Sequence, residues 1–475
     1  MSSIPFVVDL DGTLIRTDLL LESGFAFIRA QPLRLFAPVA WLAKGKAELK
    51  ARLAEQTPLE VKALPYDMAL MELLAAEKAK GREIILATAS HRRYAEQIAA
   101  HLQIIDRVIA TEGAVNLAGP AKRDALVREF GEKGFDYAGN SSADLPVWAA
   151  ARHAYVVNPD AGIEARAQAL GNVIQVMRPE GSRLRAWRKA LRLHQWAKNL
   201  LIFVPLLASH HVNQPQLLLH GLIAFVLFGL CASSVYLLND LLDLADDRHH
   251  ASKRMRPFAS GQLSLVAGLL AFPVLLVASF AGAWLLLPPF FSIALLVYYL
   301  LTLAYSLGLK RLMAVDVIAL ALLYTLRLVA GTFAFEVNLT FWMLAFSMFI
   351  FLSLALVKRY SELREARVGG VKKKTRGRGY YPDDLEMIAS LGASSGYLAV
   401  MVLALYIQDP ATVVMYHHPQ LIWLACPILL FWISRMWMLT HRGEMHDDPV
   451  VFAMEDRISL MVGASFGLIF WLATL

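Results

Sequence analysis

Apolar residues are distributed unevenly along this chain of 475 residues. As far as about Arg192, short apolar runs alternate with longer stretches of helical, amphipathic pattern, as in a soluble α/β protein. From Trp196 to Leu475 the chain is mostly apolar and is interrupted by short polar connections. The pattern predicts a soluble half followed by a membrane half, and the overall apolar fraction of 57% averages the two.

Nine apolar runs in the second half have roughly the length that a bilayer requires. The first run is short, and the basic stretch 183–198 before it has the pattern of an amphipathic helix at an anionic membrane surface. We therefore expect an all-α polytopic bundle of about nine transmembrane helices. Their approximate limits are 199–209, 217–238, 263–287, 290–309, 312–334, 340–357, 387–408, 420–437 and 457–475.

Lysine and arginine alternate between the connections that join these runs. The first, third, fifth and seventh connections contain neither residue, whereas the even connections hold the cations of 248–256, 310–311, 358–378 and Arg442. The positive-inside rule predicts a multi-pass protein of the inner (cytoplasmic) membrane. The soluble half and the even connections are then cytosolic, and the C-terminus lies on the opposite side. The net charge of +7 fits this topology and anionic substrates, so we expect no nucleic-acid partner.

The N-terminal half opens with a buried-strand pattern, 4–10, that runs into Asp9-Leu10-Asp11-Gly12-Thr13. A strand ending in D-x-D-G-T resembles the first motif of the haloacid dehalogenase (HAD) phosphohydrolase superfamily. The resemblance implies that Asp9 is the nucleophile towards a phosphoryl group and a Mg²⁺ ligand. It implies that Asp11 is the acid/base towards the leaving group and a second residue of the metal site.

The later HAD motifs follow in the same order along the chain. Thr88 ends the apolar run 84–90 and would donate to the phosphate, and Lys122 would screen the phosphate and the nucleophile. The segment 135–145 resembles the fourth motif, with Asp144 as a metal ligand and Asn140 where the commonest pattern has aspartate. We expect a Rossmannoid parallel α/β sheet with the site at the carboxyl ends of its strands.

The resemblance also predicts the domain limits. We expect a HAD-like domain at 1–178 with a helical cap at about 17–80, a basic amphipathic connector at 179–198 and the transmembrane domain at 199–475. The cap contains the unusually apolar stretch 33–41. Contact with the membrane surface and packing within the cap both remain open for that stretch.

The stretch 239–261, between two apolar runs, carries the densest group of charges beside the membrane. Asp240, Asp243 and Asp247 are spaced i, i+3 and i+7, which places them on one helical face and suits Mg²⁺. The cations that follow, among them Arg248 and Arg256, suit phosphate oxygens. Charges at the edge of a bilayer are usually functional, so the stretch predicts a Mg²⁺–diphosphate site.

This acidic pattern, N-D-x-x-D-x-x-x-D with Asn239 at its head, resembles the first motif of the UbiA superfamily of membrane prenyltransferases. The finer pattern resembles one branch of that superfamily, the decaprenyl-phosphate phosphoribosyltransferases. The segments that carry it are 195–199, 247–257, Tyr305-Ser306 with Lys310, Asp316, Arg327 with Gly331, Lys358-Arg359-x-x-Glu362, 448–450 and Asp456-Arg457.

The branch implies a polyprenyl phosphate as nucleophile and phosphoribosyl diphosphate (PRPP) as donor of C1, with Mg²⁺ in both domains. Asn239, Asp240, Asp243 and Asp247 would hold the metal and the diphosphate. The residues implied in substrate binding are Lys198, Asn199, Asn239, Arg248, His250, Lys253, Arg254, Arg256, Tyr305, Lys310, Asp316, Arg327, Lys358, Arg359 and Glu362. The product would be an arabinan precursor for cell-wall biosynthesis, and the HAD domain would remove its 5-phosphate.

Several alternatives stay open at this stage. The membrane half could be a prenyl-diphosphate:aromatic prenyltransferase or a transporter, and the HAD domain could act on an unrelated phosphate or serve in docking. Asp316 and Arg327, eleven residues apart in one span, could form a structural ion pair or line the substrate cavity. The oligomeric state is also open, a homo-oligomer included.

Overall fold

The computed structural model describes residues 4–112, 116–178, 181–209, 211, 213–250, 252–370, 378–445 and 448–475. The chain forms two compact units, one of Met1–Leu191 with Tyr236–Phe272 and the other of Arg192–Val235 with Pro273–Leu475. The division passes through two long helices, α11 (Pro215–Leu242) and α13 (Leu265–Leu286). The end of one membrane helix and the start of the next therefore belong to the unit that contains the soluble half.

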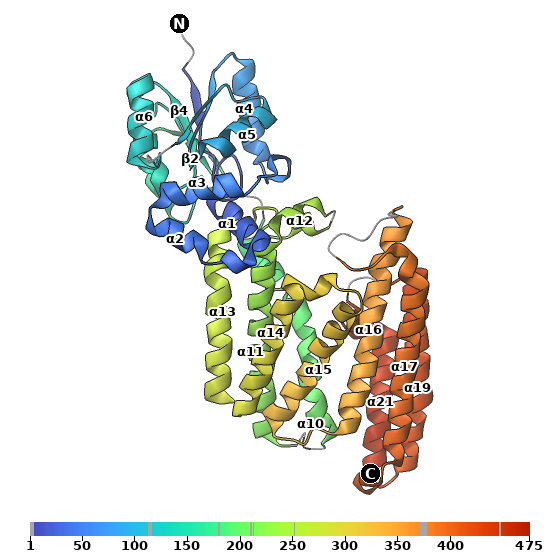
Figure 1. The fold of residues 1–475 in the computed structure, drawn as a ribbon. Coiled ribbons are helices and arrows are strands. Elements are labelled where there is room, and N and C mark those ends of the chain that lie inside the picture. The colour runs from blue at the N-terminus through green and yellow to red at the C-terminus, as the bar shows by residue number, and fades with distance from the viewer. Residues whose placement is uncertain are drawn as a thin grey trace. The chain divides into compact units, whose positions relative to one another are not determined.

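The first unit is built on a six-stranded sheet in the order β3-β2-β1-β4-β5-β6 (Figure 1). Every pair is parallel, as the alternation of strands and helices predicts. The strands are β1 (Phe6–Val8), β2 (Ile84–His91), β3 (Arg107–Thr111), β4 (Asp136–Gly139), β5 (Ala154–Val157) and β6 (Val173–Met177).

Successive residues of β1 face opposite sides of the sheet, which is why both faces are apolar. Phe6 and Val8 join a core with Leu70 and Leu74 of helix α4 and with helix α5. Val7 joins a separate core on the other side with helices α6, α7 and α8. These helices are α4 (Met68–Ala79), α5 (Arg92–Leu102), α6 (Pro120–Phe130), α7 (Leu145–Ala150) and α8 (Ile163–Gln168).

Three helices between β1 and α4 have a small core of their own, centred on Phe27, Leu49 and Leu53. They are α1 (Leu19–Ala30), α2 (Ala37–Ala43), which follows the 3-10 turn η1 (Pro32–Arg34), and α3 (Lys46–Gln56). In Figure 1 they form the blue group of helices at one end of the sheet. Lys50 of α3 contacts Ala89 at the carboxyl end of β2, so the group covers the end predicted to hold the site.

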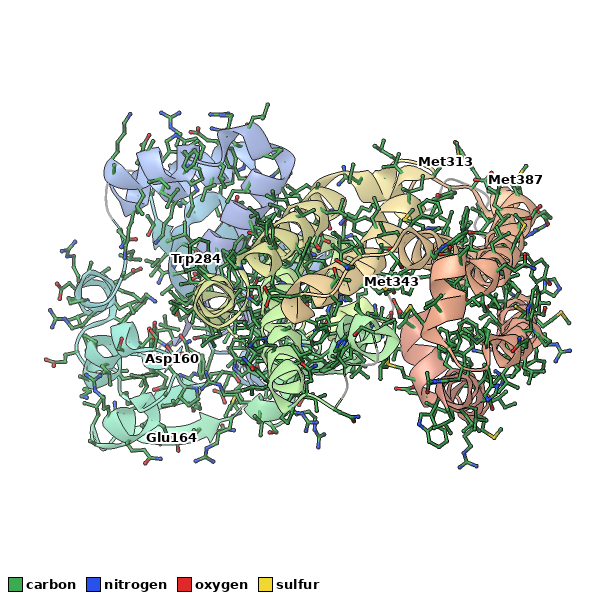
Figure 2. All side chains as sticks on the ribbon, turned by 90° about the horizontal axis from the view of Figure 1, so that it is seen from below. Asp160, Glu164, Trp284, Met313, Met343 and Met387 are labelled. Carbon is green, nitrogen blue, oxygen red and sulfur yellow. The ribbon has the colours of Figure 1, made fainter. Side chains whose placement is uncertain are left out.

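Eight helices among the described residues are long and apolar enough to cross a membrane. Many of their large side chains face outwards; Trp284 of α13 is 71% exposed and projects from its helix in Figure 2. Apolar surface of this extent requires lipid around it, so the chain is an integral membrane protein. The helices span Pro215–Leu242, Leu265–Leu286, Pro289–Leu307, Val315–Phe335, Phe341–Val368, Pro382–Gln408, Pro419–Arg442 and Arg457–Thr474.

The expected first span, 199–209, is a shorter element. It lies in η4 (Leu193–Phe203) and α10 (Val204–Ala208), which follow one another directly. This segment starts beside Asp448, which accepts a hydrogen bond from Lys198, and Figure 1 shows α10 towards the end of the second unit where the C-terminus lies. The nine spans expected are therefore eight long apolar helices and this shorter element among the described residues.

The remaining labelled elements are connecting segments in the first unit, and spans with their connecting segments in the second. In the first unit they are η2 (Val61–Ala63), η3 (Ser142–Asp144), α9 (Arg183–Ala190), α12 (Leu244–His249) and η5 (Lys253–Met255). In the second unit they are α14 (Pro289–Leu307), η6 (Leu309–Arg311), α15 (Val315–Phe335), α16 (Phe341–Val368), η7 (Pro382–Asp384), α17 (Leu385–Gln408), α18 (Pro410–Met415), η8 (Pro419–Leu424), α19 (Ala425–Arg442), α20 (Pro449–Glu455) and α21 (Arg457–Thr474).

Candidate functional sites

The predicted HAD nucleophile lies directly after β1 and beside a buried lysine. The Nζ of Lys122 donates to Oδ1 of Asp9 over 2.6 Å and to the hydroxyl of Tyr137 over 2.9 Å. Tyr137 in turn donates to Oδ1 of Asp144 over 2.7 Å. Lys122 comes from α6 and Tyr137 from β4, so the parallel sheet brings residues from three motifs to one point, as the motif order predicts.

The second acid of the motif is held by the neighbouring strand. Asp11 accepts from the backbone N–H of Leu19 over 2.8 Å and from the hydroxyl of Ser90 over 2.6 Å. The hydroxyl of Thr88, which is fully buried, accepts from the backbone N–H of Ser90 over 2.9 Å. Ser90 therefore joins the acid of one motif to the hydroxyl of the next.

Asn140 lies within this site, in the position where aspartate is commonest. Its Oδ1 accepts from Thr13 over 3.3 Å, and its backbone N–H donates to Oδ2 of Asp144 over 3.0 Å. A Cβ on Gly12, whose φ is +76°, would come within 2.2 Å of the Asn140 amide nitrogen. Glycine is therefore required in the motif by the close approach of this amide as well as by the backbone angle.

Burial dominates the electrostatics of the two acids. It raises the pKa of Asp9 to about 6, against the opposing effect of Lys122, and it raises the pKa of Asp11 to about 7 with the help of Asp18. An acid with a raised pKa keeps a proton near neutral pH, which suits Asp11 to protonate a leaving group. The pKa of Lys122 is raised although burial lowers it, because Asp9 and Asp144 are so close.

The cap contributes a cation that sequence reasoning missed. Lys50 of α3 donates to the carbonyl of Ala89 over 2.6 Å and to Oδ1 of Asn116 over 2.7 Å. Burial lowers the pKa of Lys50, and Asp11 and Asp18 oppose the shift. The cap helices gave no signal for this residue, because a lysine on an amphipathic helix usually faces solvent.

The acidic motif 239–247 lies at the end of α11 and the start of α12. Asp240 and Asp247 are both buried, and one nitrogen of Arg256, Nη1, donates to both, over 3.0 Å and 2.8 Å. Burial raises the pKa of Asp247 to about 6, while Arg256 lowers it. Two acids and one cation of the predicted site are thus in direct contact.

Other charges of this motif face the helix α1 of the HAD cap within the same unit. Arg29 approaches Asp243 at 3.4 Å and donates to Asp246 over 2.5 Å. Arg248 forms an ion pair with Glu22, with Nη1 donating to Oε2 over 3.0 Å, and its Nε donates to the carbonyl of Ala259 over 2.9 Å. Arg248, predicted to bind substrate, is therefore engaged by the cap.

The rest of the basic segment is more open. Lys253 and Arg254 lie in η5 and are exposed, and His250 contacts Ser252 through its Nδ1 at 3.2 Å. Asn239 is half-buried on the last turns of α11. These predicted substrate-binding residues lie within one short segment, on the same unit as the acids.

In the second unit, a buried aspartate gathers two of the predicted cations. Lys198 and Lys358 donate to the same oxygen of Asp448, Oδ2, over 2.6 Å and 3.1 Å, and the hydroxyl of Tyr324 lies 2.9 Å from each carboxylate oxygen. Burial alone would raise the pKa of Asp448, but the two lysines hold it well below its usual range. Asp448 also caps α20 by accepting from the N–H of Val450.

Arg327 is surrounded by aromatic rings and shares one of them, Tyr324, with Lys198. It donates to Asn199 over 3.2 Å and to the hydroxyl of Tyr298 over 3.1 Å. Its guanidinium also lies over the rings of Phe228, Tyr298 and Tyr324 at 5.0–5.7 Å. Cation–π contacts of this kind stabilise a charge that is removed from water.

The two charges of α15 are not paired with each other, so the ion pair considered for Asp316 and Arg327 is wrong. Asp316 instead contacts Nη2 of Arg359 on α16 at 2.5 Å and accepts from Tyr380 over 2.5 Å. Spacing along one helix could not reveal this partner, because it comes from another helix.

Arg359 joins a second group of polar residues. It pairs with Glu362, and Arg378 links Glu362 at 3.6 Å to the hydroxyl of Tyr305 at 2.9 Å. The Nε of Arg359 is buried and has no hydrogen-bond partner among the described residues. Lys310 is half-buried in η6, on the connection between α14 and α15.

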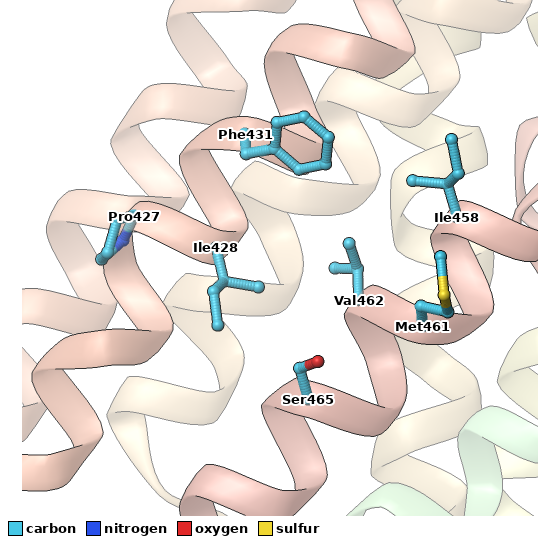
Figure 3. Close-up of a pocket in the computed structure, with 7 residues that line it drawn as sticks. All are labelled: Pro427, Ile428, Phe431, Ile458, Met461, Val462 and Ser465. Atoms are coloured by element: carbon cyan, nitrogen blue, oxygen red, sulfur yellow. The ribbon is translucent and has the colours of Figure 1, made fainter.

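A hollow on the apolar surface lies apart from all of these groups. Figure 3 shows it between α19 and α21, with Phe431, Met461 and Ser465 among its lining residues. None of the residues predicted for substrate or metal lines it. The hollow is therefore not part of the predicted substrate or metal sites.

The donor atoms of both acidic motifs fit Mg²⁺ in type, since carboxylate oxygens are its preferred protein ligands. Within the described ranges, however, no three His, Cys, Asp or Glu side chains converge as a metal site would require. The acids instead contact cations, Lys122 beside Asp9 and Arg256 beside Asp240 and Asp247. Asp9, Asp11 and Asp144 would hold a metal in one motif, and Asn239, Asp240, Asp243 and Asp247 in the other.

A polytopic helical bundle with buried cations, fused to an α/β domain with a buried aspartate–lysine pair, defines a membrane-embedded transferase joined to a phosphohydrolase-type domain. Residues 200–471 match the UbiA prenyltransferase family, and residues 6–148 match the haloacid dehalogenase-like hydrolases. The chain belongs to the UbiA prenyltransferase family and carries an N-terminal HAD-like domain.

Three relatives illustrate this membership. The chain is 38% identical to the uncharacterized protein y4nM of Sinorhizobium fredii over 97% of this chain and 89% of that protein. It is 37% identical to the nodulation protein NoeC of Azorhizobium caulinodans, over 59% of this chain and 92% of that protein. It is 30% identical to the decaprenyl-phosphate phosphoribosyltransferase of Mycobacterium tuberculosis, over 60% of this chain and 91% of that protein.

Proposed function

We propose that the membrane domain transfers 5-phosphoribose from PRPP to a polyprenyl phosphate, such as decaprenyl phosphate, and releases diphosphate. The observation that carries the proposal is the number of buried cations in the second unit: Lys198, Arg327 and Arg359 are all less than a tenth exposed. Three phosphorylated groups, the diphosphate, the 5-phosphate and the lipid phosphate, match this charge better than a prenyl donor and an uncharged aromatic acceptor do. The relative named decaprenyl-phosphate phosphoribosyltransferase supports the same reaction.

The roles follow from the chemistry of each group. Asn239, Asp240, Asp243 and Asp247 would hold Mg²⁺, which would supply charge screening for a departing diphosphate. Lys198 and Lys358, held by Asp448, bind phosphate oxygens. The buried Nε of Arg359 offers a further donor. The lipid phosphate is already ionised at neutral pH, so its oxygen attacks C1 without a general base.

In the structure the acids and cations contact each other, so they must separate before the substrate can bind. Arg256 is proposed to pass from Asp240 and Asp247 to a phosphate as the metal binds. The exposed Lys253 and Arg254, together with Arg248, His250 and Lys310, complete the basic segments that recognise the donor. Asn199 positions Arg327, Asp316 and Glu362 position Arg359, and Tyr305 contacts Arg378.

We propose that the HAD domain removes the 5-phosphate of the product. Asp9 attacks the phosphoryl group as its P–O bond to the ribose breaks, and Asp11 protonates the leaving oxygen. Water then hydrolyses the phosphorylated Asp9 and releases inorganic phosphate, which Thr88 and Lys122 bind. Tethering a phosphatase to the enzyme that makes a phosphomonoester raises the effective concentration of that product. The reaction then places the chain in the synthesis of a cell-wall arabinan precursor, on the cytosolic side of the inner membrane.

Donor choice is the test of the transferase proposal. Purified protein in vesicles is given polyprenyl phosphate and Mg²⁺ with either labelled PRPP or labelled prenyl diphosphate plus an aromatic acceptor. We expect label in the lipid from PRPP alone, its loss on chelation of Mg²⁺, and its loss in Asp240→Ala. Incorporation from prenyl diphosphate instead would assign the chain to aromatic prenyl transfer, and turnover of neither donor would favour transport.

A further inference from the structure

The cap carries an apolar surface that the proposed reaction does not use. It consists of η1 and α2, residues 32–43, and we call it the cap ridge. Leu33 is fully exposed, Phe36 is 78% exposed and Val39 is 64% exposed. The inner side of the same segment is already packed, because Trp41 meets the ring of Phe27 edge-on at 5.1 Å. The outward side chains therefore have no partner within the cap.

The sequence of the cap ridge and its immediate flanks carries charges of one sign. Between Glu22 and Glu48 the sequence contains no aspartate or glutamate, and it contains Arg29, Arg34, Lys44 and Lys46. A short apolar segment flanked by cations, without acids, is the composition of elements that lie in the headgroup region of an anionic bilayer. A protein partner would not require this excess of cations.

The ridge also starts close to a membrane helix of its own unit. Nη1 of Arg29 lies 3.5 Å from the carbonyl of Leu242, the last residue of α11, and Nη2 donates to Asp246 over 2.5 Å. Pro32, where the ridge begins, follows Arg29 by three residues. Because α11 is long and apolar enough to span a bilayer, its end marks the region where lipid headgroups are expected.

From these three observations we infer that the cap ridge inserts its apolar side chains into the anionic headgroup layer of the membrane in which the same chain is anchored. Leu33, Phe36 and Val39 enter the boundary of the acyl region, and Arg34, Lys44 and Lys46 contact lipid phosphates. The HAD site is thereby kept at the surface where lipid-linked phosphomonoesters lie. The inference does not depend on which donor the membrane domain uses.

A fluorescent probe of lipid contact tests this inference in the full-length protein. Cys231 and Cys426, both buried, are replaced by alanine, and an environment-sensitive dye is attached at Ala40→Cys, which is exposed on the ridge and leaves its large side chains intact. The matched control is the dye at Met68→Cys, on α4 of the same unit and 66% exposed. Both proteins are placed in nanodiscs of zwitterionic and anionic lipid, with and without a quencher on the lipid.

We expect the dye at position 40 to emit at shorter wavelength, to be quenched by the lipid-borne group and to be shielded from aqueous iodide, more strongly in anionic discs. The dye at position 68 should emit at longer wavelength, should not be quenched by the lipid-borne group and should stay accessible to iodide. Leu33→Glu with Phe36→Glu, both at exposed positions, should abolish the lipid quenching at position 40, and Arg34→Glu with Lys44→Glu should remove its dependence on anionic lipid. Equal access of iodide to both dyes would overturn the inference, and so would shielding at position 40 without lipid quenching, which would indicate a protein partner.

Discussion

Asp448 is the residue on which the cation group of the second unit depends. It is buried, and it offers one carboxylate oxygen to both Lys198 and Lys358. Without it, two ammonium groups would lose the carboxylate that contacts both of them. An acid of this kind keeps cations ready for phosphate, because the incoming anion can replace it without further reorganisation.

Replacement of Asp448 by asparagine keeps the shape of the side chain and removes its charge. We expect a loss of stability of about 3 kcal/mol, because one partner of a buried ion pair is then missing. The yield of PRPP-dependent lipid product should also fall. Tyr324→Phe is the matched control, since it removes hydrogen bonds to the same carboxylate at a cost of about 1 kcal/mol. Thermal unfolding measures both, and equal melting temperatures for the two variants would contradict this role.

Lys50 is the residue of the HAD site that the cap supplies. Lys50→Met should lower kcat/KM of the phosphatase by about 10- to 100-fold, because a hydrogen bond to a charged group is worth about 1.5–3 kcal/mol. The effect should appear chiefly in KM. Lys62→Met, at an exposed position in η2, is the control and should be close to wild type. Hydrolysis of a small phosphomonoester by the full-length protein is the assay, and equal KM values would count against Lys50.

Motif order alone predicts which residues meet at the HAD site, because parallel strands bring Asp9, Thr88 and Asp144 to one edge of the sheet. The same reasoning does not find Lys50 or Tyr137, since nothing local marks a cap lysine or a strand tyrosine as a neighbour of the motif. The family pattern includes Asp448 but does not mark it as a site residue. A single aspartate before a proline is equally typical of a helix cap.

At the scale of elements, the segment from α11 to α13 is an example of how tertiary contacts override linear spacing. The spacing of Asp240, Asp243 and Asp247 predicts one helical face, and the structure instead ends α11 at Leu242 and starts α12 at Leu244. Asp240 and Asp247 still meet, through Arg256, while Asp243 turns to Arg29 of the cap. The contact with Arg29, which is distant in the sequence, separates Asp243 from the other two acids.

The pair Glu22–Arg248 should couple the cap to the acidic segment. Both side chains are less than a tenth exposed. A double-mutant cycle with Glu22→Gln and Arg248→Gln should give a coupling energy of about 1–3 kcal/mol, because contacting buried charges are not additive. The same cycle on Arg92 and Glu96, an exposed pair on α5, should give much less. Coupling no larger than in that control would show that the cap contact contributes little.

At the scale of the whole molecule, the sequence predicts both domains and their classes, and both are confirmed. Hydropathy predicts eight of the nine expected spans among the described residues, because a helix satisfies its own backbone hydrogen bonds in lipid. The assignment of 236–272 to the first unit could not be foreseen. Within this unit, ion pairs such as Arg29 with Asp246 join residues that are 217 positions apart in the sequence.

One measurement tests the central claim most directly, which is that a PRPP-using transferase and a phosphatase act in sequence on one lipid. Full-length protein is given PRPP, polyprenyl phosphate and Mg²⁺, and the lipid products are analysed by mass. The account predicts a pentosyl lipid from wild type, the same lipid with one additional phosphate from Asp9→Asn, and neither from Asp240→Ala. A wild-type reaction that leaves the 5-phosphorylated lipid untouched would contradict the role of the HAD domain, and the absence of any PRPP-dependent lipid would contradict the account as a whole.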